Sequence, residues 1–254
     1  MLTKEQKLSL FKETFDYFET DEIKEWFKDV IAEIPDITLI SPSSTSLKFH
    51  NATQCQVFGN TLHLLMVGKI CHYLLGLEHM QNKFPKPKQR DCILAASYLH
   101  DAMKLGKNNS PFTLFKHPLL VGEWIKEMKV DHDIKDGLKD YISSLCASHS
   151  GQWNTSNRDK TILPKPETFE QEFIHVCDYL GSRSDIDMIY SDEFKKTISN
   201  ILKEMSETEV ITFGKYKGET VKSVYTNHKD YFEWLEDNGG IKEPMRSIIK
   251  SLNK

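Results

Sequence analysis

Apolar side chains recur every three or four positions along most of this chain, the spacing that places them on one face of an α-helix. Strand-type alternation of apolar and polar positions is nearly absent before residue 206. The pattern therefore predicts a mainly α fold. The predicted helices are two within Thr3–Ile34, then Gln56–Lys83, Lys88–Met103, one from His117-Pro118, Ile134–Ser148 and Glu170–Gly181.

Polar stretches separate these helices, and the pattern changes near the C-terminus. Residues 35–51 and 154–169 are rich in Ser, Thr, Asn or Pro and are predicted to be loops. After Ser206, EVITFGKYKGETV combines a short β-type run with a basic turn between two glycines, and two helical stretches follow, Tyr225–Asn238 and one from Pro244. We expect N-terminal helices and a loop over 1–51, a helical core over 52–206 and a small α+β appendage over 207–254.

Composition limits the function classes. The chain has 254 residues, 39% hydrophobic and 28% charged, which is typical of a soluble globular protein. Its net charge of −4 gives no global basic surface for nucleic acid, although a local basic groove is compatible with it. The five cysteines form no CxxC pair and are predicted to be reduced core residues. The absence of a signal-like or spanning apolar run predicts a cytoplasmic protein with no membrane partner.

One apolar helix ends in an imidazole and a carboxylate, His100 and Asp101, within LAASYLHDAMKLGK. Buried charge is costly unless something compensates it, and a metal ion is one such compensator. A mixed His/Asp set favours manganese, iron or zinc-like ions over calcium, and a carboxylate such as Asp101 can bridge two ions. Candidate ligands at helix ends or on helix faces are His63, His100, Asp101, His117, His149 and Asp178.

Each candidate also has a purely structural interpretation. A single histidine on an apolar helix, such as His63, is more often a packed core residue than a ligand. His117 precedes Pro118 and can simply open a helix, whereas His149 can end one, since cationic side chains are favourable at helix C-termini. Asp178 can simply be exposed. The order and spacing of the whole set favour the functional interpretation.

This order, a His, then His-Asp, then further His, then Asp, resembles the HD superfamily of metal-dependent phosphohydrolases over residues 52–190. The resemblance implies an HD-domain helical bundle with one or two divalent ions, manganese, iron, magnesium or zinc-like. It assigns Lys104 to the phosphate, as a cation and as a general acid for the leaving group. Where the family often has HDxGK, this chain has HDAMK and lacks the Gly. The implied ligands are His63, His100, Asp101 and Asp178, with His117 and His149 for a second ion.

Two further segments narrow the resemblance. This chain is similar to HD-type 3′–5′ exoribonucleases in two segments, HSGQW, which begins at His149, and FIHVCDYLGSRSDID. Those enzymes carry an OB-type domain where this chain has a helical pattern. His175 and Asp178, three residues apart, share a helical face, and we expect His175 to support the ligands.

ITFGKYKGETV and DYFEWLED resemble the small C-terminal module of exodeoxyribonuclease X-type nucleases. The second resemblance implies that Lys215, Tyr216 and Lys217 bind nucleic acid by charge and stacking, unless they form only a solvated hairpin.

Together the resemblances imply a metal-dependent phosphohydrolase, most specifically a 3′–5′ exonuclease or phosphodiesterase acting on nucleic acid. A nucleotidase or dNTP phosphohydrolase needs the same core and no strand-binding module, so it stays open as an alternative. A non-catalytic nucleic-acid-binding protein is the alternative of another class. The presence of all six ligand types argues against a degenerate site.

Overall fold

The computed structural model describes residues 2–44, 49–158, 160–241 and 243–252. Contacts divide the chain into two compact units. The larger unit is Phe11–Met188, and the smaller unit combines Met1–Leu10 with Ile189–Lys254. The sequence pattern divides the chain at residues 51 and 206, and those bounds remain predictions.

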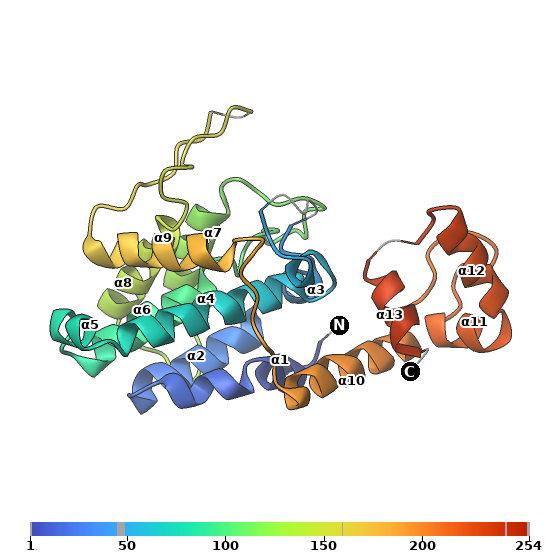
Figure 1. Cartoon of the computed structure of the whole chain (residues 1–254), viewed down its shortest axis with the longest axis horizontal. Helices are drawn as coiled ribbons and strands as arrows, with labels where there is room; N and C mark the ends of the chain where they lie inside the picture. Colours follow the sequence, from blue (N-terminus) through green and yellow to red (C-terminus); the bar gives the residue numbers. More distant parts are fainter. Residues whose placement is uncertain (1, 45–48, 159, 242, 253–254) are drawn as a thin grey trace. The chain divides into compact units, whose positions relative to one another are not determined.

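Helices joined by loops build the larger unit (Figure 1). The central helix, α4, packs against α3, α6 and α9, and α8 packs against α6, α7 and α9. The mainly α prediction is confirmed. In chain order the elements are the 3₁₀ helix η1 (Lys12–Tyr17), α2 (Asp21–Glu33), α3 (Asp36–Ile40), the 3₁₀ helix η2 (Thr53–Cys55), α4 (Gly59–Leu75), α5 (Glu78–Lys83), α6 (Pro87–Leu99), α7 (His117–Glu127), α8 (Asp136–Ala147) and α9 (Phe169–Gly181).

The first half of α4 is buried on all sides. Every residue from Gly59 to Gly68 is buried. Gly68 permits the close approach of α6, because a Cβ at this position would collide with the fully buried ring of Tyr98. A polar side chain on this half of α4, such as His63, is therefore carried into the core of the unit.

Some predicted helices are divided in the structure. The stretch 56–83 forms α4 and α5, which are separated at Gly76-Leu77, and the stretch 3–34 forms α1 (Lys4–Leu10), η1 and α2. The predicted loop 35–51 contains the short helix α3, and its residues 45–48 lie outside the described residues. Apolar periodicity continues across these breaks, so it does not reveal where a chain turns.

The smaller unit consists of α1, α10 (Asp192–Thr208), α11 (Val221–Asn227), α12 (Lys229–Asp237) and α13 (Met245–Leu252). Helix α10 packs against α1, α11 and α13. The sequence analysis missed α10, although its signals are present. Ser191 caps its first turn by accepting a hydrogen bond from the Phe194 amide. Its buried side chains include Phe194, Ile201, Leu202 and Met205, at helical spacing.

The predicted α+β character of the appendage is wrong for the described residues, which contain no strand in this unit. Val210 and Thr220 form only an isolated antiparallel bridge. The backbone between these two residues turns back on itself, and two glycines in this turn, Gly214 and Gly218, have φ of +72° and +93°. The side chain of Thr220 caps α11, so the chain enters a helix directly after the bridge.

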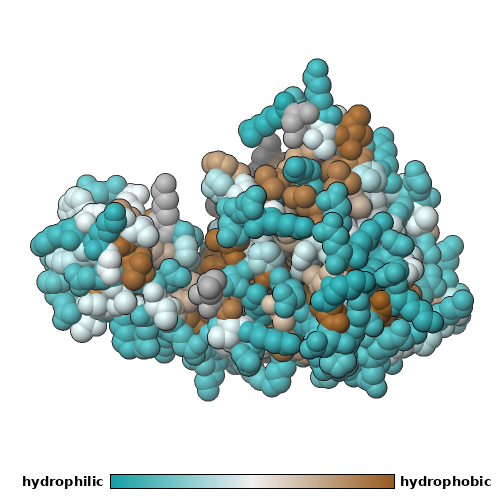
Figure 2. Space-filling view, turned by 180° about the vertical axis from the view of Figure 1, so that it is seen from behind, coloured by the Kyte–Doolittle hydropathy of each residue, from teal (hydrophilic) through white to brown (hydrophobic). Residues whose placement is uncertain are grey.

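On the face of the molecule shown in Figure 2, hydrophilic residues predominate, and hydrophobic areas on the larger unit are small and separated. Within the described ranges, no helix has both the length and the apolar content that crossing a bilayer requires.

Candidate metal centre

All six ligands predicted from the sequence converge in the larger unit. They come from five separate segments, and four of them lie at or next to a helix end. His63 is on α4, His100 follows the last residue of α6, Asp101 lies in the next turn, His117 is the first residue of α7, His149 follows the end of α8, and Asp178 is on α9.

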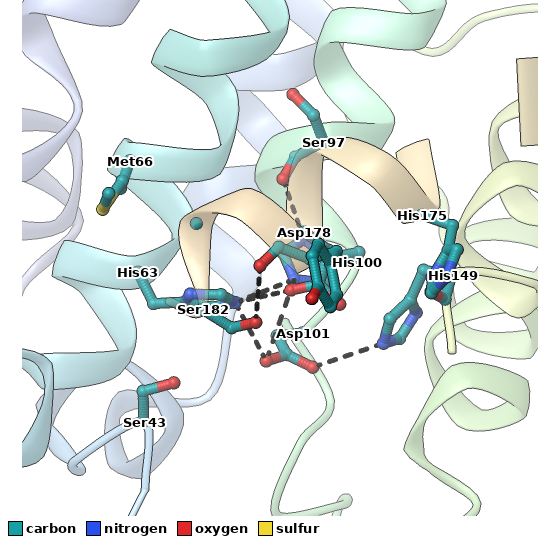
Figure 3. Close-up of polar contacts among 12 residues, drawn as sticks. Ser43, His63, Met66, Ser97, His100, Asp101, His149, His175, Asp178 and Ser182 are labelled. Carbon is teal, nitrogen blue, oxygen red and sulfur yellow. Dashed lines mark hydrogen bonds and ion pairs between the residues drawn. The ribbon is translucent and has the colours of Figure 1, made fainter. Parts of the chain in front are cut away.

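Three of these side chains form one group (Figure 3). Nε2 of His63 lies 3.1 Å from Oδ1 of Asp178, and Nε2 of His100 lies 3.5 Å from the same oxygen. The two Nε2 atoms are 3.2 Å apart. Both imidazoles are buried, whereas the Asp178 side chain is 22% exposed. The group can therefore hold a metal ion and still be reached from solvent.

Asp101 joins this group to a second one. Its Oδ2 lies 3.7 Å from Nε2 of His63 and 3.8 Å from Nε2 of His100. Its Oδ1 lies 2.8 Å from Nε2 of His117 and 3.7 Å from Nε2 of His149. Each oxygen thus faces a different pair of imidazoles, the arrangement of a carboxylate that bridges two ions.

The backbone determines which ring nitrogen faces the centre. Three imidazoles place Nδ1 against the carbonyl oxygen of the residue three positions earlier. A carbonyl only accepts, so Nδ1 must carry the hydrogen, and Nε2 of a neutral ring is then a lone pair that can bind metal. The pairs are His100 with Ser97 (2.8 Å), His117 with Leu114 (2.7 Å) and His149 with Cys146 (2.7 Å).

These tautomers leave polar atoms that protein groups alone do not satisfy. Nε2 of His117 and Nε2 of His149 are 3.2 Å apart, and with both rings neutral two lone pairs would face each other at this separation. Nδ1 of His63 is buried without a hydrogen bond from the described residues, and Oδ1 of Asp101 faces Nε2 of His117 at 2.8 Å, which donates only when that ring is protonated. Buried polar atoms are rarely left so, which means that a cation fits this donor set.

Two ionised carboxylates and a neutral imidazole suit a cation, whereas the pKa of His100 is raised, because Asp101 and Asp178 outweigh its burial. Burial lowers the pKa of His149 to about 3, so this imidazole is neutral at pH 7. Burial alone would raise the pKa of Asp101, but the charges of Lys104, His117 and His100 outweigh it and hold that pKa well below its usual range. The pKa of Asp178 is low for a related reason, since His100 and His63 outweigh its burial. Both carboxylates are therefore ionised.

Lys104 lies against the bridging carboxylate. Its Nζ is 2.6 Å from Oδ2 of Asp101 and 3.2 Å from Oγ of Ser43. The side chain is buried. The family resemblance assigns Lys104 to a substrate phosphate, and in the structure Lys104 lines the same cavity as the ligands.

This cavity has a volume of about 650 Å³, which is in the range of small-molecule and nucleotide sites. His63, Asp101, His117, His149 and Asp178 line it. Polar side chains thus form its floor. Its other walls include Pro42, Phe49, His50, Phe112, Trp153, Tyr179 and Arg183.

The sequence analysis missed His50, which lines this cavity beside His63, with ring centroids 5.0 Å apart. Its Nδ1 lies 2.7 Å from Oε1 of Gln54, whose amide nitrogen donates to the carbonyl of Gly181. Burial, with His63 and Lys104 nearby, lowers the pKa of His50 to about 4. The only sequence signal was a histidine within a predicted loop.

The remaining predicted residues lie outside this set of ligands. Nδ1 of His175 donates to the carbonyl of His149 at 2.8 Å, so His175 supports a predicted ligand through the backbone. In the smaller unit Lys215 and Lys217 are exposed, whereas Tyr216 is buried and stacks on His228 at 4.5 Å. The faces of Tyr216 therefore pack within its own unit.

Comparison of this chain with family models, with curated proteins and with solved structures finds no match. The functional interpretation therefore depends on the residues and their geometry.

Proposed function

We propose that this protein is a metal-dependent phosphohydrolase of the HD type, and most specifically a phosphodiesterase or 3′–5′ exonuclease acting on nucleic acid. The observation that supports the proposal best is the position of Asp101, with one oxygen toward His63 and His100 and the other toward His117 and His149. A carboxylate with a purely structural role does not require two pairs of imidazoles around it.

The donor set suits manganese, iron or zinc-like ions, because imidazole nitrogen and carboxylate oxygen are both ligands of these metals. His63, His100, Asp101 and Asp178 would hold one divalent ion, and Asp101, His117 and His149 would hold a second. When bound, such ions supply Lewis-acid catalysis for the transfer of a phosphoryl group to water.

The chain's own residues position the substrate. Lys104 is held by Asp101 and Ser43 at the cavity edge, and its ammonium group neutralises a phosphoryl oxygen of the substrate. Burial of the site strengthens this attraction, since the surrounding protein screens charge less than water does. Lys215 and Lys217 add exposed positive charge that suits a longer strand.

A nucleotidase or dNTP phosphohydrolase is the second candidate, and the cavity volume of about 650 Å³ favours it, because a single nucleotide fills such a space. The two candidates differ in substrate and product. An exonuclease shortens labelled oligonucleotides, whereas a nucleotidase leaves them intact and dephosphorylates free nucleotides.

The test uses protein reconstituted with manganese, iron, zinc or magnesium, and offers RNA and DNA oligonucleotides, mononucleotides and bis-p-nitrophenyl phosphate. We expect Asp101→Asn to lower hydrolysis about 100-fold or more, since a preorganised electrostatic group contributes that much to a rate. Asp140→Asn is the matched control, because Asp140 is an exposed aspartate that pairs only with Lys126 among the described residues. Wild-type protein that binds metal but hydrolyses none of these substrates would instead indicate the non-catalytic alternative.

A further inference from the structure

Four large aromatic side chains are exposed to solvent around the candidate metal centre. Phe49 is 51% exposed, Phe112 75%, Trp153 53% and Tyr179 39%, and all four line the same cavity. Exposed aromatic clusters are uncommon on soluble proteins and mark places where a ligand or partner binds. Metal binding and the neutralisation of a phosphate use none of these rings. The exposure of the four rings therefore requires another explanation.

Two of the rings form an ordered stack. The Trp153 and Tyr179 rings are nearly parallel, with 8° between their planes and 5.7 Å between their centroids. The guanidinium carbon of Arg183 lies 4.1 Å from the Tyr179 centroid. Arg183 is itself held, because its Nε donates to the carbonyl of Tyr179 at 3.0 Å. The stack therefore stands in a defined orientation while much of Trp153 stays exposed.

The stack is attached directly to two predicted ligands. Tyr179 follows Asp178, and Trp153 lies four residues after His149. The turn that joins His149 to Trp153 is closed by a hydrogen bond from the Trp153 amide to the Ser150 carbonyl at 3.0 Å. The His175 ring lies against Trp153, with centroids 5.6 Å apart, so one histidine contacts the tryptophan and bonds the backbone of the ligand His149.

We propose that Trp153 and Tyr179, with Arg183 behind them, form a subsite that stacks the nucleobase of the substrate while its phosphate lies at Lys104 and Asp101. This inference depends on the proposed function and adds the place where the base of the substrate binds. A planar, uncharged aromatic surface beside a cationic phosphate site matches the two halves of a nucleotide. Every nucleobase can stack on an aromatic ring. The subsite therefore favours substrates that carry a base over substrates that lack one, but it does not select one base over another.

The test compares a dinucleotide with the same molecule in which both bases are replaced by hydrogen, in wild type, Trp153→Ala and Trp153→Phe. We expect Trp153→Ala to lower kcat/KM for the dinucleotide about tenfold, which corresponds to ~1.4 kcal/mol, and to lower it much less for the base-free compound. Trp153→Phe should recover most of the loss, because a smaller ring still stacks. Trp234→Ala is the matched control, since Trp234 is 58% exposed and does not line the cavity.

A second readout needs no hydrolysis. Calorimetry on the protein should show adenosine monophosphate binding about tenfold more tightly than ribose 5-phosphate, and Trp153→Ala should abolish the difference. Equal losses on both dinucleotide substrates would overturn the inference, because Trp153 would then act only by holding His149. If wild type hydrolyses neither dinucleotide substrate, nor any mononucleotide or bis-p-nitrophenyl phosphate, but keeps the binding preference, the proposed function fails and the subsite stands. If it hydrolyses both equally and binds both ligands equally, the subsite fails and the phosphohydrolase stands.

Discussion

Replacing Gly151 by alanine tests the turn that carries both a predicted metal ligand and the aromatic stack. Gly151 has φ +57°, in the left-handed region. A residue with a Cβ pays ~1–2 kcal/mol to adopt this conformation. The backbone conformation alone should therefore lower the free energy of unfolding by that amount.

A second cost comes from packing. A Cβ at position 151 would collide with the ring of His175. That ring cannot move freely, because its Nδ1 donates to the carbonyl of His149 at 2.8 Å. Losing the hydrogen bond costs ~1 kcal/mol, so the total for Gly151→Ala is ~2–3 kcal/mol.

Denaturant unfolding of Gly151→Ala, His175→Ala and the double variant separates these two costs. In the His175→Ala background the collision is absent, so the double variant should be more stable than the sum of the single losses predicts, by ~1 kcal/mol. Gly239→Ala is the control for the backbone cost, since Gly239 has φ +67° and open space around its missing Cβ. Metal titration should show an affinity about tenfold lower for Gly151→Ala, because the carbonyl of His149 loses its support.

Two results would refute this reasoning. If the single losses add without coupling, the His175 ring does not restrain the turn. If Gly151→Ala is less stable by the expected amount but binds metal as tightly as wild type, the turn does not position His149.

Two variants separate the predicted roles of the lysines. Lys104→Met should lower turnover about tenfold or more and leave the metal content unchanged, because it removes the cation at the phosphate but no metal ligand. Unchanged kinetics would show that Lys104 serves only as the partner of Asp101. Replacing both Lys215 and Lys217 by glutamine should weaken oligonucleotide binding and lower the slope of log K against log salt by about 1.4. The rate of bis-p-nitrophenyl phosphate hydrolysis should not change. An unchanged slope would exclude contact of these lysines with the strand.

The elements with strong local signals could be predicted from the sequence. Helix α9 is an example, since Thr168 and Gln171 form a capping box at its start, and its predicted bounds differ by one residue from those observed. The break between α4 and α5 lacks such a signal, because Gly76 remains in helical backbone conformation and apolar residues continue on both sides. The short β-type run after Ser206 was misleading, since strand propensity without residues for a pairing partner forms no sheet.

The candidate ligands could be predicted because their signal is chemical and ordered along the chain. His50 could not, since a histidine in a polar loop has no periodicity to mark it. Its place in the cavity depends on Gln54, which is buried and bonded to Gly181 from α9. Tyr216 is the converse case, because the basic turn predicts an exposed aromatic ring, whereas in the structure this ring is buried and stacks on His228. Tertiary contacts decide both cases.

The strongest argument for a metal centre comes from how the histidines are oriented. His100, His117 and His149 each donate Nδ1 to the carbonyl three residues earlier, a bond available locally beside a helix end. The local chain alone therefore sets the tautomer, and it directs all three Nε2 atoms toward Asp101. With neutral rings and no ion this arrangement is costly, because the lone pairs of His117 and His149 face each other at 3.2 Å and Nδ1 of His63 is buried without a hydrogen bond from the described residues. A cation among these atoms would convert each repulsion into an attraction, so the orientation of the three rings supports the proposed metal site.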